Sequence, residues 1–146
     1  MYRLMQPSDR AAVLALWQSQ RRETEEFAQK AIEQFAGEQN VYVAEENDAV
    51  AAAALAVPVT LQGRTGTYLY GLCGEGRLIL AGLLDYLCAQ QKLRGAGFTV
   101  AVPGSAAETA PKANAAVISI RLKEKAGEKP AILRKLILSI SSPHIK

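Results

Sequence analysis

The stretch over residues 67–102 constrains the fold most, because its hydrophobic period changes twice. Tyr68–Cys73 is an apolar and aromatic run of the kind that forms a buried strand. Gly74–Gly76 breaks that run. From Arg77 onward, apolar side chains recur at spacings of three and four, which predicts one face of a helix. Phe98–Val102 then predicts a second short strand.

Two parallel strands around a helix would make this stretch a βαβ unit with a right-handed crossover. Its glycine loop would then present backbone N–H groups and a helix N-terminus at one place. Such a place suits an anion or a phosphate.

The residues before this unit predict two helices and a set of antiparallel strands. Helix starts are expected near Ser8 or Asp9 and near Glu23. Tight turns at Asn47-Asp48 and Gly63–Gly66 would join three strands into a meander. The expected elements are a strand at Tyr2–Met5, helices from Asp9 and over Glu23–Ala36, and strands over Val41–Glu46 and Ala49–Gln62.

After the unit, the pattern predicts a short helix from Ser105 and a strand over Ala116–Leu122. Ala131–Ile140 fits either a helix or a closing strand. The order of elements places the chain in the α+β class.

The length of 146 residues predicts a single domain covering the whole chain, 1–146. With 49% hydrophobic and 21% charged residues, the composition is that of a soluble globular protein. We find no signal-peptide pattern and no apolar run long enough to cross a bilayer, so we expect a cytoplasmic protein without a membrane partner.

The few cysteines and the single histidine limit which metal sites and catalytic mechanisms we expect. Cys73 and Cys88 are expected to be buried free thiols. His144 is the only histidine and lies near the C-terminus, so we predict no metal site and no Ser-His-Asp or Cys-His mechanism.

Charge divides unevenly between the two halves of the chain. Residues 1–73 carry six Lys and Arg against nine Asp and Glu, a net of −3. Residues 74–146 carry eleven against five, a net of +6. A basic half suits a phosphorylated cofactor or a nucleic acid, and it is equally compatible with a solvated surface.

With its glycine turn after the fourth strand, this order of elements resembles the GCN5-related N-acetyltransferase (GNAT) superfamily over nearly the whole chain. The stretches that carry the resemblance are Val41–Glu46, Gly66–Leu72, Gly82–Leu87 and Phe98–Pro103. It implies a mixed, mostly antiparallel sheet of six to seven strands flanked by helices. It also implies that acetyl-CoA lies where the fourth and fifth strands separate.

The resemblance implies a set of cofactor-binding residues. Leu72 and Cys73 would pair through their backbone with pantetheine, and Gly74, Glu75, Gly76 and Arg77 would meet the pyrophosphate. Its implied activity is transfer of an acetyl group to a primary amine on a small molecule or a peptide.

Two departures from the family pattern keep a second hypothesis open. Leu80 stands where the family loop has a glycine, counting from Arg77, and no tyrosine occurs over residues 111–116, where the family places a general acid. The alternative is a catalytically degenerate GNAT-fold module that binds or regulates. The sequence names no catalytic residue.

Two partner questions are also open. The basic segment over residues 121–146 would suit nucleic acid, but no aromatic residue follows Phe98, which makes nucleic acid an unfavoured partner. The alanine-rich arm Ala49–Val59 is compatible with a homodimer.

Overall fold

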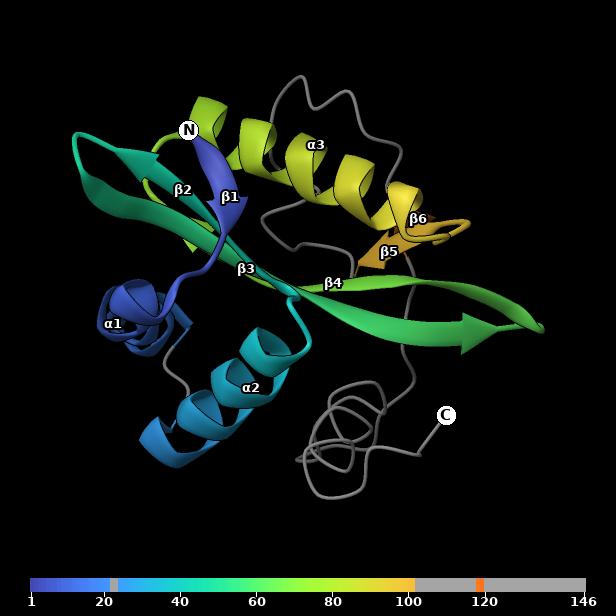
Figure 1. The fold of residues 1–146 in the computed structure, drawn as a ribbon, viewed down its shortest axis with the longest axis horizontal. Helices are drawn as coiled ribbons and strands as arrows, with labels where there is room; N and C mark the ends of the chain where they lie inside the picture. Colours follow the sequence, from blue (N-terminus) through green and yellow to red (C-terminus); the bar gives the residue numbers. More distant parts are fainter. Residues whose placement is uncertain (22–23, 102–117, 120–146) are drawn as a thin grey trace.

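The structure is a computed structural model that describes residues 1–21, 24–101 and 118–119. It has a mixed α+β fold in which a mostly antiparallel sheet is covered by helices on both faces (Figure 1). The strands are β1 (Tyr2–Leu4), β2 (Val41–Glu46), β3 (Ala49–Leu61), β4 (Arg64–Gly74), β5 (Thr99–Ala101) and the two-residue β6 (Ile118–Ser119). The helices are η1 (Pro7–Asp9), α1 (Arg10–Arg21), α2 (Glu25–Gly37) and α3 (Arg77–Leu93).

The sheet runs in chain order from β1 to β6, and the pairs β1–β2, β2–β3 and β3–β4 are antiparallel. The predicted meander of β2, β3 and β4 is confirmed. Its turns are tight because Asn47 and Asp48, and then Gln62 and Gly63, all have positive φ. The second turn lies one residue earlier than predicted, so that Arg64 already belongs to β4.

Pro58 occupies an edge position of β3. Strand β2 pairs with β3 only as far as Leu55, so at Pro58 the long β3–β4 hairpin has β4 on one side. The missing N–H of Pro58 therefore costs no ladder hydrogen bond.

The βαβ unit is also confirmed. Strand β5 lies parallel to β4, with Thr67 opposite Thr99 and Tyr68 opposite Val100, and α3 connects the two strands. The two-residue β6 continues the parallel arrangement beside β5. Of the predicted strand over 116–122 only Ile118–Ser119 is described, and the helix from Ser105 and the segment 131–140 lie outside the described residues. The count of six to seven strands therefore stays a prediction.

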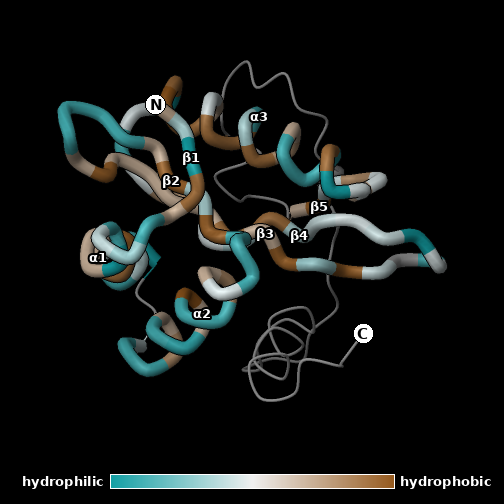
Figure 2. Tube along the Cα trace, viewed as in Figure 1, coloured by the Kyte–Doolittle hydropathy of each residue, from teal (hydrophilic) through white to brown (hydrophobic). Residues whose placement is uncertain are grey.

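Two apolar cores lie on opposite faces of the sheet. Helices α1 and α2 cover one core, in which Trp17, Phe35 and Tyr68 are buried. Helix α3 covers the other, through Leu83, Leu84 and others. The apolar colour in Figure 2 gathers along the middle of the sheet, while the tips of the β2–β3 and β3–β4 hairpins are hydrophilic.

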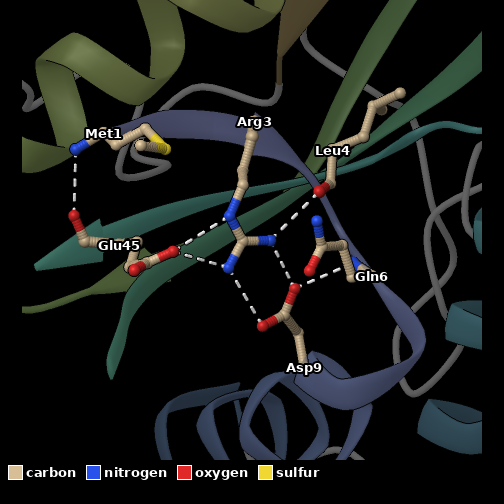
Figure 3. A network of polar contacts seen from close by, with 6 residues as sticks. All are labelled: Met1, Arg3, Leu4, Gln6, Asp9 and Glu45. Carbon is tan, nitrogen blue, oxygen red and sulfur yellow. Dashed lines mark hydrogen bonds and ion pairs between the residues drawn. The ribbon is translucent and has the colours of Figure 1, made fainter. Parts of the chain in front are cut away.

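A salt-bridge network joins the N-terminal strand to its neighbours (Figure 3). The Arg3 guanidinium donates to both carboxylate oxygens of Asp9, at 2.5 and 3.1 Å, and to Glu45 Oε1 at 2.8 Å. Asp9 also accepts the Gln6 backbone N–H at 2.8 Å, so the N-cap of η1 is Gln6 and not Ser8 or Asp9, near which the sequence predicts a helix start. The hydrogen bond from Arg3 holds the pKa of Asp9 below its usual range.

Both cysteines are free thiols, as predicted, although Cys88 is only half-buried. Burial raises the pKa of the Cys88 thiol. Within the described part of the chain, no helix combines the length and the apolar character that a membrane span requires.

Candidate functional site

Strands β4 and β5 pair over only a short distance and then part. Their register begins at Thr67 and Thr99 and ends at Tyr68 and Val100, whereas β4 continues to Gly74. Among the described residues, β3 alone pairs with this later part of β4. Among the described residues, Leu69–Gly74 of β4 therefore have no strand on the β5 side, and α3 begins directly after this stretch, which we call the split.

The backbone of β4 faces this split from Leu69 onward. The Thr67 N–H donates to the Phe98 carbonyl at 2.9 Å, and the Thr65 carbonyl accepts the Gly97 N–H at 2.9 Å. Alternate residues of a strand present their N–H and C=O groups to the same neighbour. Leu69 therefore directs its backbone groups toward the side that β5 has left.

A β-bulge at Gly71 follows. Residues Gly71 and Leu72 of β4 both lie opposite the single residue Ala54 of β3. Gly71 has a φ of 72°, and its carbonyl accepts the Trp17 indole N–H at 3.1 Å. A Cβ on Gly71 would overlap the indole ring. The bulge is thus fixed by α1, through a tryptophan that is fully buried.

The last residue of β4 and the first residue of the following loop each use their backbone donor internally. The Gly74 N–H donates to Gln20 Oε1 at 2.9 Å, and the Glu75 N–H donates to the Ala51 carbonyl at 3.3 Å. Gly74 has a φ of 148°, and a Cβ there would meet the Ala51 carbonyl and Ala52. These contacts hold the loop close against β3.

The N-terminus of α3 is the accessible part of the loop. Its N-cap is Gly76, with a φ of 97°, and no side chain caps the helix. The first N–H groups of an α-helix lack intrahelical partners, and they carry the positive end of the helix dipole. Glu75, Gly76, Arg77 and Leu78 are all exposed around this terminus, Leu78 to 75%.

The six predicted cofactor-binding residues therefore lie next to one another at the split. They differ in which of their groups a ligand could reach. Leu72 and Cys73 are buried in opposite cores, Leu72 against α3 and Cys73 on the α1/α2 side, so only their backbone can face a ligand. Gly74 is half-buried, whereas Glu75, Gly76 and Arg77 are exposed.

Sequence reasoning missed Leu69 and Gly71 and the two α1 residues that support them, Trp17 and Gln20. The strand alternation through Thr67 could have indicated Leu69. Nothing in the sequence pattern indicates that Gln20, 54 residues before Gly74, would accept its N–H.

Near the C-terminal end of α3, a cluster of hydrogen-bonded polar side chains joins the helix to the sheet. We name it the closed-end network. Gln91 Oε1 accepts the Thr67 hydroxyl at 3.0 Å, and Gln91 Nε2 donates to Asn40 Oδ1 and the Tyr42 hydroxyl. Arg94 completes it by donating to Asn40 Oδ1 at 2.7 Å. The network contacts β4 at Thr67, where β4 pairs with β5. It therefore fixes the position at which the split begins.

Two ionisable groups on the α1/α2 side of β4, Tyr68 and Cys73, are protonated at neutral pH. Burial raises the pKa of Tyr68 to about 12 and that of Cys73 to about 11. The positive charge of Arg21 offsets part of each shift. Neither group is a base at pH 7. Among the described residues there is also no cluster of three or more His, Cys, Asp or Glu side chains that could hold a metal.

Comparison with solved structures identifies the fold. The chain is similar to a predicted acetyltransferase with acetyl-CoA from Clostridium acetobutylicum, with a TM-score of 0.65 over 92% of this chain and 97% of that one, at 16% identity. It is also similar to a GNAT family acetyltransferase from Brucella melitensis in complex with acetyl-CoA, with a TM-score of 0.60 over 72% and 76%, at 19% identity.

A third similar structure is a ribosomal-protein-alanine N-acetyltransferase from Brucella melitensis, with a TM-score of 0.62 over 75% and 79% of the two chains, at 22% identity. No protein-family model and no curated protein sequence matches the chain. The predicted GNAT resemblance is confirmed in the fold, and the low identities mark the sequence as divergent.

Proposed function

We propose that the protein is an acetyl-CoA-dependent N-acetyltransferase that acts on a primary amine. The observation that carries the proposal is the split between β4 and β5, which opens beside an uncapped helix N-terminus. Similar structures that contain acetyl-CoA support the proposal through the shared fold.

The described residues fit the two chemically distinct parts of such a cofactor. The pantetheine arm carries amides, and the edge of β4 from Leu69 offers backbone groups of strand geometry for them. The pyrophosphate is an anion, and the N–H groups at the start of α3 together with the Arg77 guanidinium suit it. Gly76 lets that backbone come close, because it has no side chain.

Bound acetyl-CoA supplies an acetyl thioester, whose carbonyl carbon takes the new C–N bond as the C–S bond breaks and the sulfur leaves with the electron pair. The amine would lose one proton and the departing CoA thiolate would gain one, so that the products are an amide and the CoA thiol. The protein contributes binding and orientation, because a positioned amine reacts as if it were highly concentrated. Tyr68 and Cys73 remain protonated at neutral pH, so neither accepts that proton.

A second candidate function is a GNAT-fold module that binds or regulates without transferring acetyl groups. The specific observation in its favour is the composition of the loop. Glu75 places an exposed carboxylate beside the proposed pyrophosphate site, and Leu80 packs against the core on the α3 side at the family's glycine position. A like charge next to a phosphate weakens its binding.

Calorimetric titration with acetyl-CoA and with CoA tests the proposal. We expect micromolar binding of both ligands and a loss of about three- to tenfold in affinity for Arg77→Ala, because a cation beside a phosphate contributes about 1 kcal/mol. The matched control is Lys92→Ala, which removes an exposed cation from the opposite end of α3 and should leave affinity unchanged.

Absence of binding at millimolar ligand, with the protein folded, would reject the acetyltransferase and favour the module. Equal effects of Arg77→Ala and Lys92→Ala would mean that the ligand responds to net charge and not to this helix terminus.

A further inference from the structure

Resting on the proposed acetyltransferase function, we infer that Gln20 is a positioning residue for the pyrophosphate of the cofactor. Its side chain does not bind the ligand. It holds Gly74, and through Gly74 it holds the turn from which the first N–H groups of α3 would point at the phosphates. The inference rests on a hydrogen bond between the end of α1 and the end of β4, which are 54 residues apart in the chain.

The last turn of α1 places the Gln20 amide beside the end of β4. Gln20 Oε1 accepts the Gly74 N–H at 2.9 Å. One turn earlier, the fully buried Trp17 donates its indole N–H to the Gly71 carbonyl at 3.1 Å. Residues three apart on a helix lie on the same face, so both side chains reach the same part of β4. Trp17 therefore fixes the place from which Gln20 binds.

Gly74 is held by contacts and not by its own conformational preference. Strand β3 lies close, because a Cβ on Gly74 would be 2.5 Å from the Ala51 carbonyl oxygen and from the Ala52 Cβ. The next residue, Glu75, donates its N–H to that Ala51 carbonyl at 3.3 Å. A glycine with a φ of 148° has wide backbone freedom. The direction of the chain at Gly74 therefore depends on β3 and on the hydrogen bond to Gln20.

The start of α3 follows from this point within two residues. The N-cap Gly76 has a φ of 97°, and no side chain caps the helix. Its carbonyl accepts the Leu80 N–H at 3.0 Å, which closes the first turn. A rotation at Gly74 would therefore turn the first N–H groups of α3 relative to β4. Several N–H groups bind one anion well only when they converge on it.

The competing hypothesis is that the hydrogen bond has no role beyond stability. Gln20 is exposed, and water can replace an exposed hydrogen bond at little cost in the free energy of unfolding. Removal of a purely structural contact of this kind would leave both the fold and the ligand affinity nearly unchanged. A positioning role predicts instead a loss of affinity that is confined to ligands with phosphate groups.

The test uses Gln20→Met and Gln20→Glu in the full chain, with three ligands. Methionine has nearly the helix propensity of glutamine but offers only a weakly accepting sulfur, whereas glutamate keeps an acceptor oxygen. The ligands are CoA, pantetheine, which lacks the pyrophosphate, and inorganic pyrophosphate. NMR titration of the ¹⁵N-labelled protein measures each affinity, and hydrogen exchange of the Gly74 amide reports the contact itself.

Gln20→Met should separate the ligands by their phosphate groups. We expect faster exchange at Gly74 and a loss of about three- to tenfold in the affinity for CoA and for pyrophosphate, with the affinity for pantetheine within about twofold of that of the native protein. Gln20→Glu should restore the protection of the Gly74 amide and part of the affinity for CoA. Its added negative charge keeps the recovery partial.

Gln29→Met is the matched control. Gln29 lies on α2, is exposed, and donates to Glu25 Oε1 at 3.3 Å, so the control also removes an exposed side-chain hydrogen bond of a glutamine. It should leave the three affinities and the exchange of the Gly74 amide unchanged.

The outcomes separate the inference from the function on which it rests. CoA binding that is unchanged in Gln20→Met, or that falls together with pantetheine binding, overturns the positioning role and leaves the acetyltransferase intact. Pyrophosphate binding that weakens in Gln20→Met, in a protein that binds neither CoA nor acetyl-CoA, supports the role of Gln20 and overturns the acetyltransferase. If neither CoA nor pyrophosphate binds the native protein, both are wrong.

Discussion

The two ends of α3 meet the sheet in opposite ways. At its C-terminal end, Gln91 satisfies Thr67, Asn40 and Tyr42 inside the protein, at the point where β4 and β5 are paired. At its N-terminal end, Gly76 caps the helix without any side chain, and no described strand pairs with the adjoining part of β4 on its β5 side. The polar groups at the C-terminal end of α3 therefore form hydrogen bonds within the protein. The backbone N–H groups at its N-terminal end face solvent.

This difference shows how a βαβ unit can keep one end of its helix accessible for the proposed ligand. A split sheet would close or fray unless its paired end were fixed, and the closed-end network fixes it. At the open end, α1 supports β4 in place of β5, through Trp17 at the bulge and Gln20 at Gly74. Changes at the closed end should therefore cost stability, whereas changes at the helix N-terminus should alter ligand affinity.

The largest effect is expected where α1 supports the bulge. Gly71→Ala places a Cβ inside the Trp17 indole at a positive φ, and we expect a loss of about 3 kcal/mol in the free energy of unfolding, measured in urea. Gly63→Ala is the control, because its φ of 78° is similar but no atom lies within 4 Å of the added Cβ. It should lose only about 1 kcal/mol. Equal losses would mean that the Trp17 contact does not support the bulge.

At the closed end, Gln91→Leu should lower the free energy of unfolding by about 2 kcal/mol. It removes the hydrogen bonds that Gln91 makes to the buried Thr67, Asn40 and Tyr42. Thermal or urea unfolding measures the loss. The control is Gln90→Leu at the neighbouring, half-buried residue, and its free energy of unfolding should stay within about 0.5 kcal/mol of that of the native protein. A similar loss of stability in both variants would contradict a role for the network.

The Arg3 network should contribute to stability in a pH-dependent way and leave the ligand site unaffected. The lowered pKa of Asp9 means that its contribution is present above the ordinary carboxyl pKa and is lost as the pH falls through the lower folded value. Asp9→Asn should therefore cost about 1 to 2 kcal/mol at pH 7 and progressively less from about pH 5 downward.

Urea unfolding at a series of pH values measures this difference. Glu33→Gln, which removes an exposed ion pair with Arg10, serves as the control and should change stability by less than about 0.5 kcal/mol. A constant deficit of Asp9→Asn down to pH 2 would show that the effect is not carried by ionisation.

The smallest predicted effect concerns the open end alone. Glu75→Gln removes an exposed negative charge next to the proposed pyrophosphate site, and we expect CoA affinity to rise about twofold in calorimetry, with stability unchanged. Glu46→Gln, an exposed carboxylate at the end of β2, is the charge-matched control. A decrease in affinity would place the carboxylate among the groups that bind the ligand.

The sequence predicted the parts of this arrangement that depend on local pattern. Alternation located β2, the spacing of leucines located α3 after Gly76, and the paired turn residues located both hairpin tips. These features are set by neighbours in the chain, so a single sequence reveals them. The break between strand and helix at Glu75 and Gly76 was predicted for the same reason, although β4 extends through Gly74.

The support of the site could not be predicted, because it depends on contacts between distant segments. Nothing in the run around Trp17 shows that its indole bonds the Gly71 carbonyl, 54 positions later. The position of Gly71 as a bulge depends on its register with Ala54. Gln91 reads as an ordinary polar residue on a helix, and only its buried partners reveal its role.

The most direct test of the contrast between the two ends is an NMR titration of the ¹⁵N-labelled protein with CoA. We predict the largest amide shift changes at Leu69 and over residues 76–79, with little change over residues 91–95. Perturbation concentrated at the closed end, or none at the N-terminus of α3 at saturating ligand, would contradict the account.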